Sequence, residues 1–241
     1  MDALQLQQVS KKYAKQLILK NIDFSIQQGE FLALVGVNGA GKTTLIKAIL
    51  DFEEVNSGQI SIFGQSHLKA QSRQPLSFLP EQFRPPTFLT GLQFLNYITK
   101  LHQVHIKPVE ISNLCQQLDL DMQALKKPIK KYSKGMNQKL GLISCFLTKK
   151  SLLILDEPMS GLDPKARAYL KRYLLGLKQQ QQHTLFFTTH LLFDIEVLCD
   201  RMAILHDGEL LFIGTPQQCH AQYQTDDLEQ AYLRCIGADD V

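Results

Sequence analysis

Short apolar runs recur along the chain, and each is bounded by turn residues or by a segment with helical periodicity. Runs of this length are typical of β-strands, and an uninterrupted run indicates a strand that is buried on both faces. The predicted strands are Ile22 to Ile26, Phe31 to Val35, Ile60 to Phe63, Leu152 to Leu155 and Leu185 to Phe187. The pattern therefore predicts a sheet that other elements cover.

Helical segments lie between and after these runs. The clearest are Thr43 to Leu50, Asn137 to Leu147 and Pro164 to Leu177. Strands that alternate with helices are typical of a mainly parallel sheet with helices packed on it. The predicted fold class is therefore α/β.

One long segment is helical throughout. From about Gln93 to Lys131 no strand-like run occurs, and Pro108 and Pro128 interrupt the pattern. Because prolines mark helix boundaries, this segment predicts several short helices. We expect a small helical subdomain, over residues 93–150, inserted into a single domain that spans residues 1–241.

The end of the chain predicts a hairpin and two helices. The apolar runs Met202 to Leu205 and Glu209 to Ile213 flank Asp207-Gly208, a pair that tolerates the positive φ of a tight turn. Capping residues then predict two helices within residues 215–241. The first is expected to begin at Thr215-Pro216, and the second at Asp226 with Glu229.

Composition places the chain among ordinary globular proteins. Of the 241 residues 44% are hydrophobic and 20% are charged. The longest apolar stretches are far shorter than the roughly 18 residues of a membrane helix, and the N-terminus lacks the pattern of a secretory signal. We therefore expect a cytoplasmic protein, and any membrane-spanning part must belong to a partner.

Charge and cysteine content exclude several functions. The five cysteines are scattered without a CxxC pair, which favours reduced thiols over disulfides or zinc. The net charge of +3 is too small to indicate nucleic-acid binding. A local basic run is predicted to be a solvated face; it comprises Lys126, Lys127, Lys130, Lys131 and Lys134.

A glycine-rich segment, Gly36 to Thr43, follows the apolar run directly and precedes a helical segment. Such glycines let successive N–H groups and a helix N-terminus face the phosphates of a nucleotide. Lys42 supplies a cation, and Thr43 supplies a hydroxyl for Mg²⁺. The predicted ATP-binding residues here are Gly36, Asn38, Gly39, Ala40, Gly41, Lys42, Thr43 and Thr44.

Two carboxylates follow another apolar run, as Asp156 and Glu157. The carboxyl ends of parallel strands meet at one edge of a sheet, so both acids are expected near the phosphate loop. Alternation along a strand would point them in different directions. We predict that Asp156 holds Mg²⁺ through water and that Glu157 is the general base for the attacking water.

A third motif, Tyr132-Ser133-Lys134-Gly135-Met136, precedes a helical segment and lies between the other two in chain order. It resembles the signature motif of ATP-binding cassette (ABC) proteins. The family form is usually Leu-Ser-Gly-Gly-Gln, which Ser133 and Gly135 match; Tyr132, Lys134 and Met136 depart from it. The departures resemble a variant that is common in export-type transporters.

This resemblance implies a P-loop ATPase with N-terminal antiparallel β elements beside the parallel sheet. It also implies a head-to-tail homodimer, in which Ser133 and Gly135 of one copy contact the ATP held by Lys42 of the other. Without the family, Ser133 would be interpreted as an ordinary helix N-cap. Asp163, in Ser160-Gly161-Leu162-Asp163, resembles the D-loop, which crosses the dimer interface.

Three further positions resemble family motifs. His190 resembles the switch histidine, which positions water beside the γ-phosphate. Tyr13 lies where an aromatic residue stacks on adenine, although a core tyrosine is an alternative. In Phe78-Leu79-Pro80-Glu81-Gln82, Glu81 stands where the family places a glutamine that senses Mg²⁺, so either Glu81 or Gln82 is the sensor.

The resemblance implies a transport ATPase that uses ATP and Mg²⁺ and is peripheral on the cytoplasmic face of the cell membrane. Its partners would be a second copy and an integral membrane permease. We expect Gln82 to Leu92 to form part of the groove for a cytoplasmic helix of that permease. The alternative is a soluble ABC ATPase without a transporter. A non-hydrolytic regulator is disfavoured because Glu157 and His190 are both present.

Overall fold

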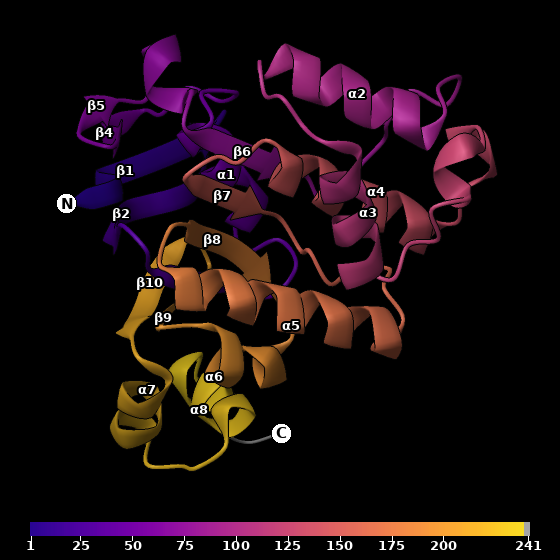
Figure 1. The fold of residues 1–241 in the computed structure, drawn as a ribbon. Helices are drawn as coiled ribbons and strands as arrows, with labels where there is room; N and C mark the ends of the chain where they lie inside the picture. Colours follow the sequence, from indigo (N-terminus) through magenta and orange to yellow (C-terminus); the bar gives the residue numbers. More distant parts are fainter. Residues whose placement is uncertain (239–241) are drawn as a thin grey trace.

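Three of the predicted strands, Phe31 to Val35, Leu185 to Phe187 and Leu152 to Leu155, lie side by side in one six-stranded sheet. A computed structural model describes residues 1–238 and shows this sheet between helices (Figure 1). In spatial order the strands are β10 (Glu209–Gly214), β9 (Arg201–His206), β3 (Phe31–Val35), β8 (Thr184–Thr189), β7 (Leu152–Leu155) and β6 (Leu76–Leu79). Neighbouring strands are parallel except β10, which is antiparallel to β9.

The central strand β3 is buried on both faces. Phe31, Ala33 and Val35 pack into the hydrophobic core that the longer helices share, whereas Leu32 and Leu34 pack into a second core on the opposite face. Every side chain of β3 is at most 2% exposed. A strand between two cores has no solvent-facing position, which explains its uninterrupted apolar sequence.

A second, antiparallel sheet packs against the second core. Its strands, in spatial order, are β2 (Gln16–Gln27), β1 (Asp2–Tyr13), β4 (Ser57–Ile62) and β5 (Gln65–Ser66). The family resemblance predicted this sheet correctly. The apolar pattern located only parts of β2 and β4 and missed β1, because exposed polar side chains such as Gln7 and Lys12 interrupt it.

The predicted helices are present, and they cover the two faces of the parallel sheet. Helix α1 (Lys42–Ile49) packs into the core shared with the antiparallel sheet. On the opposite face lie α4 (Lys134–Leu147) and α5 (Pro164–Gln180). The α/β fold class is therefore confirmed.

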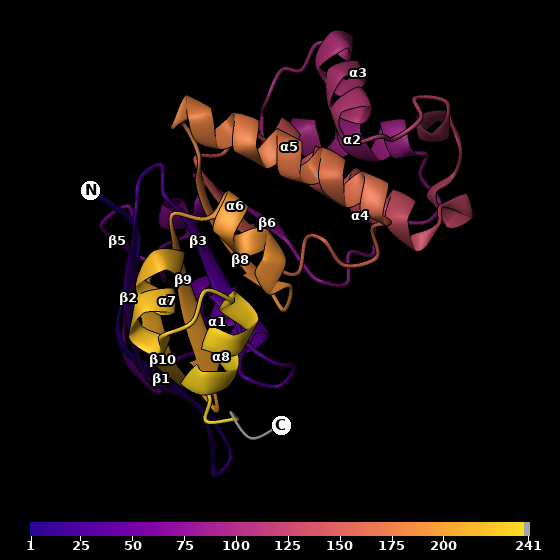
Figure 2. The same cartoon turned by 90° about the horizontal axis from the view of Figure 1, so that it is seen from below.

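The helical segment 93–131 projects to one side of the sheets (Figure 2). It contains α2, which begins slightly before the segment, and α3, followed by two short 3₁₀ turns. Their bounds are α2 (Gly91–Leu101), α3 (Pro108–Gln117), η2 (Ala124–Lys126) and η3 (Ile129–Lys131). In both views α2 and α3 lie far from the C-terminal helices (Figures 1 and 2).

The C-terminal part follows the prediction with one correction. The hairpin turns at Asp207-Gly208, and Thr215 caps α7 (Pro216–Tyr223). The second helix, α8 (Leu228–Cys235), is capped by Asp227 and not by Asp226, because Asp227 immediately precedes the first helical residue and its carboxylate reaches the Glu229 N–H at 2.7 Å. Residues 239–241 of the predicted helical segment lie outside the described residues.

The remaining elements are short: η1 (Ala70–Arg73), η4 (Leu192–Asp194) and α6 (Ile195–Leu198). Within residues 1–238, no helix has both the length and the apolar character needed to cross a membrane. The five cysteines are free thiols, and four of them are buried.

Candidate nucleotide-binding site

Four segments of the site begin where parallel strands end. The glycine-rich loop follows β3, Asp156 follows β7, His190 follows β8, and Glu81 lies just beyond β6. These strands are neighbours in the order β3, β8, β7, β6 and run in the same direction. Their carboxyl ends therefore bring all four segments to one edge of the sheet.

The glycine-rich loop leaves the first amides of α1 open to a ligand. Helix α1 begins at Lys42, and its N-cap, Gly41, has a left-handed φ of 109° and no side-chain cap. At Gly36 an added Cβ would lie 2.5 Å from the carbonyl oxygen of Leu205, so only glycine fits there. Uncapped N–H groups at a helix N-terminus form a favourable anion site.

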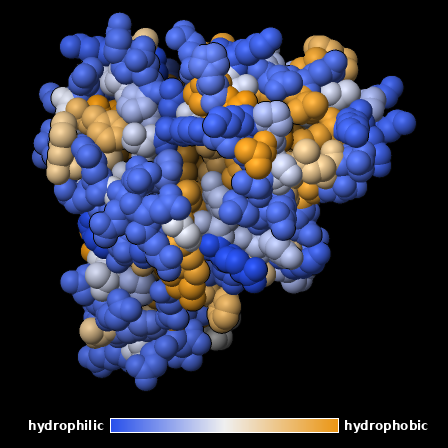
Figure 3. Space-filling view, viewed as in Figure 1, coloured by the Kyte–Doolittle hydropathy of each residue, from blue (hydrophilic) through white to orange (hydrophobic). Residues whose placement is uncertain are grey.

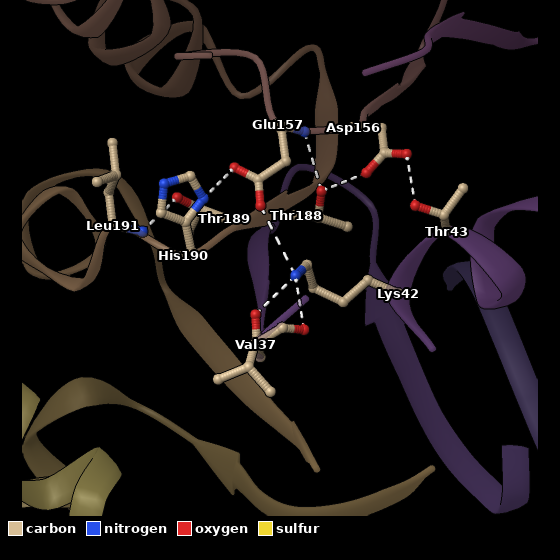
Figure 4. A network of polar contacts seen from close by, with 10 residues as sticks. Val37, Lys42, Thr43, Asp156, Glu157, Thr188, Thr189, His190 and Leu191 are labelled. Atoms are coloured by element: carbon tan, nitrogen blue, oxygen red, sulfur yellow. Dashed lines mark hydrogen bonds and ion pairs between the residues drawn. The ribbon is translucent and has the colours of Figure 1, made fainter. Parts of the chain in front are cut away.

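The Lys42 ammonium is held inside this loop. Nζ donates hydrogen bonds to the carbonyl oxygens of Gly36 at 2.6 Å and Val37 at 3.3 Å (Figure 4). It also lies 3.7 Å from Glu157 Oε1, and both side chains are buried. The loop thus carries a fixed positive charge at its centre, next to a carboxylate.

Asp156 is held by two threonine hydroxyls. Thr43 Oγ1 donates to Asp156 Oδ2 at 3.1 Å, and Thr188 Oγ1 donates to Oδ1 at 2.6 Å. Burial raises the pKa of the Asp156 carboxyl, and the two hydroxyl hydrogen bonds oppose that shift. The Thr43 and Asp156 oxygens lie side by side, and hard oxygen donors of this kind suit Mg²⁺.

Glu157 lies in a turn and not on the strand. Strand β7 ends at Leu155, and Glu157 has a left-handed φ of 49°. Its N–H donates to Thr188 Oγ1 at 2.9 Å. The two carboxylates do face different partners, as predicted, but the reason given was wrong: the turn separates them, and strand alternation does not.

One oxygen of the Glu157 carboxylate contacts His190, and the other has no hydrogen bond within the described chain. Oε2 lies 2.9 Å from His190 Nδ1. Because a carboxylate only accepts hydrogen bonds, Nδ1 must carry the proton, which leaves Nε2 of a neutral ring free to accept. Oε1 is buried and has no hydrogen-bond partner among residues 1–238. A buried oxygen of this kind can accept a proton from water.

Thr188 links the two carboxylates, and sequence reasoning missed it. Its hydroxyl donates to Asp156 and accepts from the Glu157 N–H (Figure 4). The residue is completely buried on β8. Its signal in the sequence was the pair of hydroxyl residues, Thr188 and Thr189, at the end of an otherwise apolar run.

Tyr13 lies at the cavity and is held by charged neighbours. Its side chain is 41% exposed, so the alternative of a core tyrosine is wrong. Lys11 Nζ lies 4.8 Å from the ring centroid and 3.2 Å from Glu53 Oε2. Hydrogen bonds from the side chains of Lys11 and Tyr13 lower the pKa of the Glu53 carboxyl, and the one from Lys11 has the larger effect. Neither Lys11 nor Glu53 had a sequence signal, because they lie about 40 positions apart.

A cavity of about 380 Å³ gathers most of the predicted residues. Its lining consists of Tyr13, Ile18, Val37, Asn38, Gly39, Gly41, Lys42, Thr43, Thr44, Glu81, Asp156 and Glu157. Gly36 and Ala40 belong to the same loop but do not line the cavity. His190 reaches it through Glu157. An aromatic ring, a phosphate-type loop and three carboxylates therefore share one concave site.

The cavity distinguishes Glu81 from Gln82. Glu81 lines it together with Thr43 and Asp156. Gln82 lines a neighbouring hollow, where its Oε1 accepts a hydrogen bond from Arg84 at 2.7 Å. This geometry favours Glu81 as the residue nearer to a bound metal ion.

Ser133, Gly135 and Asp163 do not line the cavity that holds Lys42. Ser133 Oγ accepts from the Met136 N–H at 3.2 Å as the N-cap of α4, and Asp163 Oδ1 accepts from the Ala166 N–H at 2.8 Å as the N-cap of α5. Both side chains therefore have the structural role of a cap within this chain. A contact between Ser133 and a nucleotide in this cavity would have to come from another copy.

Comparisons of the sequence with known proteins agree with this site. The sequence profile described as "ABC transporter" matches residues 19–160. An uncharacterized ABC transporter ATP-binding protein of Synechocystis is 40% identical over 82% of the chain, which covers 56% of that relative. The linearmycin resistance ATP-binding protein of Bacillus subtilis is 31% identical over 97% of the chain and 76% of its own length. The chain thus spans little more than half of the Synechocystis relative.

Solved structures show the same fold. The ATP-binding subunit of an ABC transporter superimposes with a TM-score of 0.88 at 29% identity, over 97% of this chain and 99% of that one. A dimeric ATP-binding cassette bound to ADP and phosphate superimposes with a TM-score of 0.79, over 88% of this chain and 98% of its own. At 20% identity, this second likeness concerns the fold alone.

Proposed function

The chain belongs to the ABC transporter family of ATP-binding proteins, and from this premise we propose that it binds and hydrolyses ATP to drive a transporter whose membrane-spanning part is a separate subunit. The observation that carries the proposal is the position of Glu157. Its Oε1 is buried in the cavity wall without a hydrogen bond from the described residues, 3.7 Å from the Lys42 ammonium. A carboxylate next to a bound triphosphate can take the proton of the attacking water.

The side chains of the site divide the chemistry between them. The glycine-rich loop and Lys42 bind the phosphates. Glu157 accepts the proton of water, and the His190 ring keeps the Glu157 carboxylate in place through their 2.9 Å contact. Nε2 of His190 can then accept a hydrogen bond from water beside the γ-phosphate.

Thr43 and Asp156 suit Mg²⁺, with Glu81 nearby. Among residues 1–238 no group of three or more His, Cys, Asp or Glu could hold a metal ion. This fits Mg²⁺, which binds to one or two protein oxygens and completes its shell with phosphates and water. Bound there, the ion would neutralise charge on the phosphates, and it would offset the buried charge of Asp156.

A head-to-tail homodimer completes the proposed site. Ser133 and Gly135 do not line their own cavity, and they lie at the N-terminus of α4, where backbone N–H groups favour an anion. The fold shared with a dimeric cassette supports pairing of two copies, so that Ser133 of one contacts the ATP of the other. Asp163 would lie at the same interface.

Replacing Tyr13 by leucine should weaken ATP binding about tenfold and leave tripolyphosphate binding unchanged. Stacking of a base on an aromatic ring contributes roughly 1–3 kcal/mol, and tripolyphosphate has no base to stack. Titration calorimetry with both ligands measures the two affinities.

Tyr97→Leu is the matched control, because Tyr97 is a tyrosine on α2 that is 55% exposed and lies outside the cavity. Equal weakening of ATP and tripolyphosphate in Tyr13→Leu would mean that the ring does not stack on adenine.

The segment from Gln82 to Leu92 offers an exposed aromatic residue for the membrane subunit. Phe88 is 82% exposed. Phe83 instead packs inward, with its ring centroid 5.7 Å from that of Phe94. We therefore assign contact with a cytoplasmic helix of the permease to Phe88, and assign to Phe83 the packing that holds the segment.

The double variant Phe83→Ala with Phe88→Asp should lose its membrane partner during purification in detergent. The single variants separate the two causes. Phe88→Asp removes the contact without loss of stability, whereas Phe83→Ala lowers the free energy of unfolding by about 2 kcal/mol. An unchanged amount of partner with the double variant would exclude this surface.

Purification of the tagged protein from native membranes with ATP present tests the proposed function. A multi-span membrane protein recovered in near-equal amount supports a transporter. Export is favoured as the direction because one relative is named a bacitracin transport ATP-binding protein, from Bacillus licheniformis, and another a linearmycin resistance ATP-binding protein. Recovery with soluble partners only would instead favour a soluble ABC ATPase.

A further inference from the structure

Positive charge is concentrated in the helical subdomain and in the segment that precedes it, residues 82–92. Residues 82–150 contain 11 Lys and Arg but only three Asp and Glu, whereas the whole chain contains 26 and 23. The rest of the chain therefore carries more acidic than basic residues. No Asp or Glu occurs from residue 82 to 109 or from 122 to 155.

Four lysines of the subdomain lie close together on one segment, residues 126–131, and we call them the lysine face. It comprises Lys126, Lys127, Lys130 and Lys131, all exposed. The segment is anchored from below by Leu125, Ile129 and Tyr132, which are at most 9% exposed. The Tyr132 hydroxyl also donates to the Ala124 carbonyl oxygen at 2.7 Å. The fixed apolar side chains hold the backbone, and the lysines project into solvent.

An exposed apolar residue lies beside the lysine face. The Ile129 N–H donates to the Leu89 carbonyl oxygen at 2.8 Å, and the Lys130 N–H donates to that of Thr87 at 3.3 Å. These bonds place Phe88 next to the lysines, and Leu92, which is 38% exposed, follows on the same segment. Figure 3 shows apolar side chains exposed among hydrophilic ones over this part of the molecule.

The lysines of this face have no counter-charge within the described chain. None of the four forms an ion pair with a carboxylate in residues 1–238. Neighbouring lysines do: Lys139 and Lys165 pair with Asp119, and Lys149 pairs with Glu110. Four ammonium groups are therefore available to an anionic partner.

We propose that the lysine face binds the anionic surface of a lipid bilayer. Four lysines without fixed contacts keep their rotamer freedom. A rigid protein partner would require them to lose that freedom, whereas a fluid layer of headgroups does not. Each lysine attracts such a surface as a point charge. In the proposed transporter Phe88 contacts the permease and the lysines beside it meet the surrounding headgroups, and only in this placement does the proposal rest on the proposed function.

Binding of the purified full chain to protein-free vesicles tests this proposal. The wild type should sediment with vesicles of phosphatidylcholine and phosphatidylglycerol but not with phosphatidylcholine alone, and added salt should release it. The triple variant Lys126→Gln, Lys127→Gln, Lys130→Gln should bind about 100-fold more weakly, at about 1 kcal/mol for each lysine.

Lys12→Gln, Lys15→Gln, Lys69→Gln is the matched control, since it removes three exposed lysines elsewhere and should bind as the wild type does. An unchanged melting temperature shows that the lysine-face variant is folded. Undiminished binding by that variant, or equal binding of the wild type to neutral vesicles, would overturn the proposal. Loss of the membrane partner by the lysine-face variant in lipid-free detergent would also overturn the proposal, because the lysine face would then bind protein. Vesicles contain no permease, so this result is independent of the proposed function.

Discussion

ATP hydrolysis by the Glu157→Gln variant is expected to fall by about three orders of magnitude, while ATP binding is retained. General-base catalysis contributes roughly 10²–10⁴-fold, and an amide cannot accept the proton of water. The substitution keeps the size of the side chain and an oxygen that can accept from His190. Steady-state phosphate release and equilibrium ATP binding, measured on the same preparation, separate the two effects.

Retained ATP should also stabilise the proposed dimer of this variant. Light scattering with and without Mg-ATP measures the mass, and we expect a dimer only in the presence of the nucleotide. Glu209→Gln is the control, because Glu209 is an exposed carboxylate in the C-terminal hairpin that pairs with Lys20 and does not line the cavity. Hydrolysis near the wild-type rate in Glu157→Gln would show that another group is the base.

The Lys42→Ala variant should instead lose nucleotide binding, by roughly 100-fold or more. Hydrogen bonds between a charged donor and phosphate contribute about 1.5–3 kcal/mol each, and Lys42 can make more than one. The ammonium lies 2.6 Å from the Gly36 carbonyl oxygen within a closed loop, so Lys42→Arg should not restore binding, because the larger guanidinium does not fit there.

Lys47→Ala controls for a lost lysine on the same helix, since Lys47 is exposed on α1. Fluorescence titration with an ATP analogue measures all three variants. If Lys42→Ala bound ATP as tightly as Lys47→Ala does, the phosphates would have to be held by the backbone of the loop alone.

The elements best predicted from the sequence are those buried on both faces. β3, β7 and β8 contact hydrophobic core on each side, so their runs are continuous and could not be mistaken for loops. β1 has solvent on part of its surface, and in β6 Ser77 interrupts the apolar run. Neither leaves a strong periodic signal, because their pairing depends on neighbours that are distant in the sequence.

The residues of the site also differ in how well the sequence predicts them. Lys42, Thr43, Asp156 and Glu157 lie in short motifs whose chemistry is local, and the cavity brings them together. The left-handed turn at Glu157 and the hydroxyl of Thr188 between the carboxylates depend on how β7 and β8 are aligned. That alignment is a property of the folded sheet, and no single segment encodes it.

The uneven distribution of charge gives the subunit an electric dipole. Its positive end is the helical subdomain, and its negative end is the remainder of the chain. Within roughly one Debye length, about 8–10 Å at physiological ionic strength, an anionic surface would rotate such a molecule before any contact forms. The rate of capture from solution should therefore depend on salt more steeply than the rate of release. Salt weakens the orientation that precedes contact, whereas apolar groups pack only after contact has formed.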